Sequence, residues 1–211
     1  MVIKPTVIPG PAMDTLDLCS NAPHFVGLFV VYLLFICAIC RKFSKGTDMF
    51  KHWPFYLSAI IGLILLQTFG ISIDALKGMI LTLLLLYASL SDFKYRKVPD
   101  CVSLMIVILA FVGFDSSNLL SMILGAITVF IPQLALAMMK PERAIGGADL
   151  KLSTALAFLL GAQKGLFALI FGMLLAVITM AIYNKVNEQD QKEGFPLVPF
   201  LWMGATLAYI L

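Results

Sequence analysis

The feature that most constrains this fold is a series of eight apolar stretches divided by short polar breaks. By residue number they cover 25–40, 55–71, 76–91, 101–114, 119–139, 150–160, 166–184 and 197–211. A helix needs about 20 apolar residues to cross the hydrocarbon core of a bilayer. We therefore predict an all-α, polytopic membrane protein with about eight transmembrane helices, of which the fourth and sixth are short or re-entrant.

The composition agrees with this prediction, because 61% of the residues are hydrophobic and only 13% are charged, unlike an ordinary soluble domain. We expect a short non-cytoplasmic N-terminal segment over 1–24 and a transmembrane helical domain over 25–211. The lipid bilayer is then one partner of the protein. The net charge of +3 is ordinary where loops face anionic lipid, and we expect no nucleic-acid partner.

The basic residues predict the orientation. Twelve of the 15 fall in alternate breaks, the segments 41–54, 92–100, 140–151 and 185–196. They are Arg41, Lys42, Lys45, Lys51, Lys94, Arg96, Lys97, Lys140, Arg143, Lys151, Lys185 and Lys192. Cytoplasmic loops are enriched in Lys and Arg, so these four segments are predicted to face the cytoplasm. The predicted location is the inner (cytoplasmic) membrane, with several crossings.

This topology brings two acidic residues to the same side. Asp92 follows the third apolar stretch and Asp149 precedes the sixth, so both carboxylates are predicted to lie at the cytoplasmic membrane border. An acid at the end of a span costs less than one at its centre. Taken alone, the topology is equally consistent with a functional pair and with ordinary juxtamembrane charges balanced by nearby lysines.

Three motifs favour the functional pair. "SDFKYRKVPD" contains Asp92 and Lys94, "GGADLKL" repeats the Asp-x-Lys arrangement at Asp149 and Lys151, and "FPLVPFL" precedes the last stretch. In this order they resemble the type IV prepilin peptidase family of membrane aspartyl proteases. The resemblance implies cleavage of the short basic leader from type IV pilin-like precursors at the cytoplasmic face. It also implies which residues are catalytic and which support them. The predicted catalytic residues are Asp92 and Asp149, and the supporting residues are Lys94, Lys151, Gly146, Gly147 and Ala148.

The second motif departs from the usual bacterial pattern, Gly-x-Gly-Asp. Here Gly146 and Gly147 are followed by Ala148, which is similar to the archaeal preflagellin peptidase variant. The subfamily therefore stays open. In either case small residues allow a backbone or a substrate chain to approach closely.

Peptide hydrolysis by such a pair needs one carboxylate to take a proton from water and one carboxylic acid to give a proton to the peptide carbonyl. Two acids that share a site repel one another and titrate as a unit. As a hypothesis, the dipole at a helix N-terminus would make Asp149 ionise first.

Two other functions use the same residues. A presenilin-like intramembrane protease would also employ two aspartates, but deeper in the bilayer. A small proton-coupled transporter could use the acids as a proton relay. The sequence does not identify the pilin that is cleaved or the oligomeric state.

We expect neither a metal nor a cofactor. Cys37 and Cys40 form a single CxxC, which is half of a four-thiolate zinc site. Larger members of the family that the chain resembles carry a cytoplasmic domain after the first span and also methylate the new N-terminus. The corresponding segment here, "RKFSKGTDMFKHWP", is too short for a cofactor pocket, so no N-methylation is predicted.

Overall fold

In a computed structural model, the chain is described over residues 15–44, 53–139, 146–187 and 196–211, and the regular secondary structure of this part is all helical. It contains eight α-helices and the short 3-10 helix η2 (Ser116–Asn118). The helices are α1 (Thr15–Ser44), α2 (Trp53–Phe69), α3 (Ile73–Tyr95), α4 (Asp100–Ala110), α5 (Leu119–Met139), α6 (Gly147–Leu160), α7 (Ala162–Asn187) and α8 (Val198–Ile210). The predicted all-α fold is confirmed, and each predicted apolar stretch corresponds to one of these helices.

Four helices contain segments long and apolar enough to cross a membrane: Val26–Phe43, Ile73–Tyr95, Ser116–Ala135 and Ala162–Lys185. In three of them only 22% of the segment is buried, whereas α3 is 56% buried. Large apolar side chains such as Leu34, Leu120 and Val177 are therefore exposed, as expected for helices that face lipid. The remaining helices are shorter, so eight complete crossings stay a prediction.

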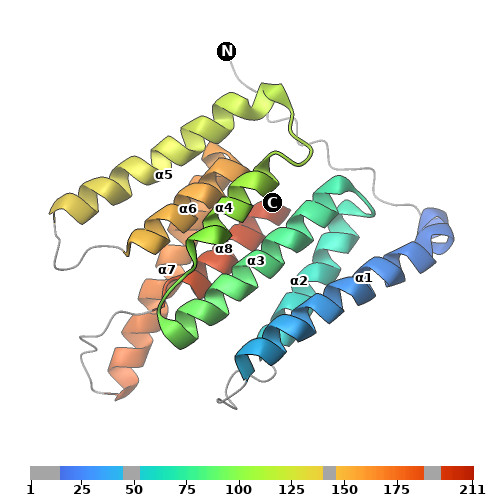
Figure 1. The fold of residues 1–211 in the computed structure, drawn as a ribbon, viewed down its shortest axis with the longest axis horizontal. Coiled ribbons are helices and arrows are strands. Elements are labelled where there is room, and N and C mark those ends of the chain that lie inside the picture. Colours follow the sequence, from blue (N-terminus) through green and yellow to red (C-terminus); the bar gives the residue numbers. More distant parts are fainter. Residues whose placement is uncertain (1–14, 45–52, 140–145, 188–195) are drawn as a thin grey trace.

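Figure 1 shows the helices as a bundle in which α3 and α8 lie near the middle. Helix α8 packs against α3, α6 and α7, and α4 packs between α3 and α6. The large buried side chains include Leu85 and Leu86 of α3, Leu156 of α6 and Trp202 of α8. The chain thus surrounds its two central helices with helices that expose apolar side chains.

Glycines allow the helices to approach closely. A Cβ atom at Gly204 of α8 would collide with the carbonyl oxygen of Ala168 in α7, and one at Gly125 of α5 would lie 2.5 Å from the carbonyl oxygen of Ala157 in α6. Interfaces of this kind are typical of membrane helices, where small residues bring backbones together. They fix the positions of α6 and α8 relative to the rest of the bundle.

Several helix ends differ from the predicted boundaries. Helix α1 begins at Thr15 rather than at residue 25, so residues 15–24 of the predicted N-terminal segment are helical. Helix α4 ends at Ala110, four residues earlier than predicted, because the chain then turns through Gly113 with φ of 63°. The predicted cytoplasmic residues Lys45, Lys51, Lys140, Arg143 and Lys192 lie outside the described residues.

Candidate active site

Asp92 lies in the last turn of α3 and is buried, with 9% of its surface exposed. Its Oδ2 atom accepts a hydrogen bond of 3.3 Å from the backbone N–H of Val198, the first residue of α8. The first N–H groups of a helix have no partner within the helix, and the positive end of the helix dipole favours a nearby negative charge. The start of α8 therefore provides a donor to the carboxylate of Asp92.

The turn that follows α3 holds Asp92 close to the beginning of α4. Arg96 caps the helix with a left-handed backbone conformation (φ 51°), and its N–H donates to the carbonyl oxygen of Asp92 at 2.8 Å. The hydroxyl of Ser91 donates to the carbonyl oxygen of Lys97 at 2.7 Å. These two bonds tie the loop back onto the last turn of the helix.

Asp149 is half-buried in the first turn of α6. A Cβ atom at Gly146, the N-cap of this helix, would lie 3.1 Å from Oδ2 of Asp149. The absence of a side chain at Gly146 thus leaves room for the carboxyl group. Gly147 is exposed with open space around it, whereas Ala148 packs against the hydrophobic core.

The charge of Asp92 acts on Asp149 although the two acids come from different helices. The pKa of Asp149 is raised to about 6, first because burial penalises the charged carboxylate and second because of repulsion by Asp92. This effect is opposite to that of the helix dipole, on which the hypothesis of early ionisation depended. A carboxyl group with such a pKa is partly protonated near neutral pH, as a proton donor requires.

The two supporting lysines have other partners. The ammonium of Lys94 donates to the carbonyl oxygen of Phe43 at 3.0 Å, in the last turn of α1, where carbonyl groups lack partners within the helix. The ammonium of Lys151 forms an ion pair of 2.9 Å with Asp100, and both side chains are mostly exposed. Asp100, for which the sequence indicated no role, therefore links the start of α4 to α6.

Sequence reasoning did not identify Val198 as a partner of Asp92. The motif "FPLVPFL" contains it, but the contact is made by the backbone, which a residue pattern does not display. The proline after Val198 was the available signal, because proline favours the first turn of a helix. A helix that begins at this point has free N–H groups to offer.

Comparison with known proteins shows similarity to one family. Residues 79–182, which include both acids, match the sequence model of the type IV leader peptidase family. The chain is also similar to the prepilin leader peptidase/N-methyltransferase of Bacillus subtilis (strain 168), with 25% identity over 149 residues. That match covers 67% of this chain and 58% of the relative, so the chain spans less than two thirds of the relative's length. No solved structure matches. The predicted resemblance to the prepilin peptidase family is confirmed.

Proposed function

We propose that this chain, which matches the type IV leader peptidase family over residues 79–182, is an aspartyl endopeptidase that removes the short basic leader from type IV pilin-like precursors. The observation that carries the proposal is the coupling of two acids from separate helices, since Asp92 contributes to the raised pKa of Asp149. Groups perturbed by both burial and a specific charge are candidates for catalysis. Precursors with a basic leader are the substrates that the family implies.

We assign the two acids different roles, because Asp92 accepts a hydrogen bond from a backbone N–H and itself repels a negative charge on Asp149. The N–H of Val198 donates to Asp92, and a hydrogen bond of this kind stabilises the charged carboxylate. Asp92 is then the base that takes a proton from water. Asp149, with a pKa of about 6, is the acid that protonates the carbonyl oxygen of the scissile peptide as the water attacks its carbon.

The position of the acids along their helices favours a leader peptidase over a presenilin-like protease. Asp92 is in the last turn of α3 and Asp149 is in the first turn of α6, so neither lies at the centre of a helix. A peptide bond at the membrane surface is then the accessible substrate. The positive-inside rule makes this surface the cytoplasmic one.

The proposed reaction ends with hydrolysis, without N-methylation. The Bacillus subtilis relative is named as a methyltransferase as well as a peptidase, but this chain spans 58% of it. Here α1 ends at Ser44 and α2 begins at Trp53, which leaves eight residues between them. The mass of a mature pilin N-terminus produced by this enzyme alone tests the point, and a mass increase of one methylene group, dependent on S-adenosylmethionine, would contradict it.

The decisive experiment is co-expression with candidate pilin precursors, including archaeal preflagellins, followed by mass measurement of their N-termini. The wild type should release the leader, and Asp92→Asn and Asp149→Asn should each abolish release while the protein still accumulates in the membrane. Asp100→Asn is the matched control, because it lies on the same side of the bundle but pairs with Lys151. Normal cleavage by either of the first two variants would refute the assignment, and proton-coupled uptake without a cleaved product would favour the transporter.

A further inference from the structure

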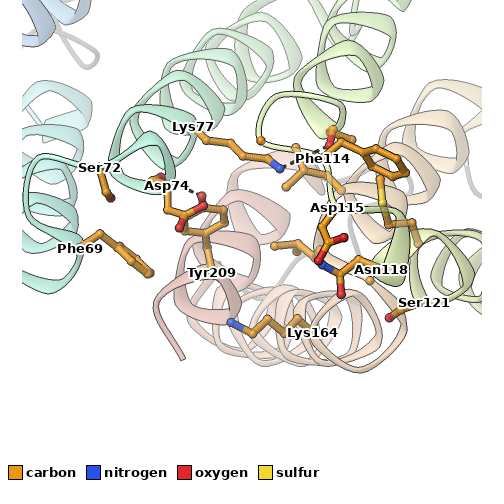
Figure 2. A pocket seen from close by; sticks show the side chains of 16 residues that line it. Phe69, Ser72, Asp74, Lys77, Phe114, Asp115, Asn118, Ser121, Lys164 and Tyr209 are labelled. Atoms are coloured by element: carbon orange, nitrogen blue, oxygen red, sulfur yellow. Dashed lines mark hydrogen bonds between the residues drawn. The ribbon is translucent and has the colours of Figure 1, made fainter. Parts of the chain in front are cut away.

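A cavity of about 520 Å³, lined by charged, polar and apolar residues, lies at the end of the bundle opposite the two acids. Figure 2 shows it from close by. Asp74 and Lys77 line it from the start of α3, whereas Asp92 is near the end of that helix. The separation of Asp74 and Asp92 along the helix is 18 residues, or about 27 Å at 1.5 Å per residue. The cavity is therefore separate from the candidate active site.

The cavity lies where three candidate membrane spans begin. The cavity is lined from the first two turns of three spans, Ile73–Tyr95, Ser116–Ala135 and Ala162–Lys185. The lining residues there include Lys77, Asn118 and Lys164. Aromatic and aliphatic side chains complete the wall. The cavity thus lies at the membrane border, where lipid headgroups meet the hydrocarbon region.

Charges of both signs surround the cavity. In Figure 2, Lys77 and Lys164 approach it from two directions, with Asp74 beside Tyr209 on one side and Asp115 on the other. The hydroxyl and backbone N–H of Ser117 donate to Asp115 at 2.7 Å and 3.2 Å and lower its pKa, so this carboxylate is ionised. Two ammonium groups and two carboxylates are complementary to a ligand that carries one negative and one positive charge.

The two lysines differ in their partners. The ammonium of Lys77 donates to the carbonyl oxygens of Val112 at 3.1 Å and Ala110 at 3.4 Å. It therefore provides hydrogen-bond donors for carbonyl groups at the end of α4. Lys164 is half-buried, and the negative charge that acts on its ammonium is that of Asp74. A half-buried ammonium at the membrane border is stabilised by an anionic oxygen.

We propose that this cavity binds the headgroup of a zwitterionic phospholipid with a primary amine, of the phosphatidylethanolamine type. Lys164 binds the phosphate, and the carboxylates of Asp115 and Asp74 accept hydrogen bonds from the lipid ammonium. The volume is within the range of small-ligand sites, about 300–1,000 Å³. A choline headgroup has the same charges but no N–H donor, and a glycerol headgroup has no positive charge.

The test uses the purified full chain and native mass spectrometry with phosphatidylethanolamine, phosphatidylcholine and phosphatidylglycerol of matched acyl chains. Phosphatidylethanolamine should bind most tightly. Lys164→Gln should weaken its binding about tenfold or more, as expected for loss of a charge-assisted hydrogen bond, and Lys164→Arg should retain it. Asp115→Asn should remove the preference for ethanolamine over choline.

Lys185→Gln is the matched control, because Lys185 is exposed at the other end of α7 and should leave lipid binding unchanged. Equal binding of the three lipids, or equal losses in Lys164→Gln and Lys185→Gln, would overturn the proposal. Equally tight binding of water-soluble glycerophosphoethanolamine would contradict a membrane lipid as the occupant. Leader cleavage is measured separately, so failure of the lipid site is distinguishable from failure of the proposed peptidase function.

Discussion

Replacing Asp149 by Asn should stabilise the protein at alkaline pH. Each unit by which a pKa differs between the folded and unfolded chain corresponds to about 1.4 kcal/mol. The rise from 3.8 to about 6 at Asp149 therefore corresponds to about 3 kcal/mol. Because the side chain is only half-buried, water screens part of this cost, and we expect about 1–2 kcal/mol, or a few degrees in Tm.

The size of the stabilisation depends on pH. Near pH 4 the folded state keeps the proton and the cost is small. Between pH 4 and about 6 the unfolded chain ionises this carboxyl group while the folded chain keeps its proton, so the stability of the folded state falls until the pH passes its pKa of about 6. Asn has nearly the same shape and never ionises, so the gain should be present at pH 8 and mostly lost at pH 4.

Thermal unfolding in detergent at these two pH values provides the measurement. Asp100→Asn is the control, because that side chain is 71% exposed and paired with Lys151, and it should give no gain. A loss of stability in Asp149→Asn at pH 8, or the same change at both pH values, would refute the reasoning.

Four further predictions follow from the geometry. Leader cleavage should decline as the pH rises through about 6, because Asp149 loses the proton that it donates, and a flat profile would count against this role. Gly204→Ala should cost about 1–3 kcal/mol in thermal unfolding, because its Cβ collides with Ala168, whereas Gly27→Ala has open space and should cost nothing. Lys151→Gln should change stability by less than about 1 kcal/mol, since its ion pair is exposed, and should leave cleavage intact. After replacement of the native cysteines, a cysteine at position 117 should react with an impermeant reagent in intact cells and one at position 97 should not; the reverse would contradict the orientation.

The helices could be predicted from the sequence because apolar stretches between polar breaks have few other stable forms in a membrane. The placement of Asp92 and Asp149 at the same end of the bundle followed from counting alternate helices. Helix lengths were less predictable. Apolar residues such as Phe111 and Phe114 continue the fourth stretch, yet the helix stops at Ala110, since the backbone turns before the apolar residues end.

The partners of individual side chains could not be predicted. Lys94 and Lys151 occupy the same position after an aspartate, but one bonds a carbonyl of α1 and the other pairs with Asp100. These partners are 51 residues away in the sequence in each case. The cavity at the opposite end was missed for a similar reason, because Asp115 and Lys164 are far from Asp74 and Lys77 in the chain and meet them only through packing.

Helix α8 joins α3 at both ends, through the N–H of Val198 to Asp92 and through the hydroxyl of Tyr209 to the carbonyl oxygen of Asp74 at 2.8 Å. Among the eight helices it is the last to leave the ribosome. Until it has inserted, Asp92 lacks this donor and the buried surfaces of α3 and α7 lack their partner. The order of synthesis thus provides Asp92 with this donor only after the other seven helices have been made.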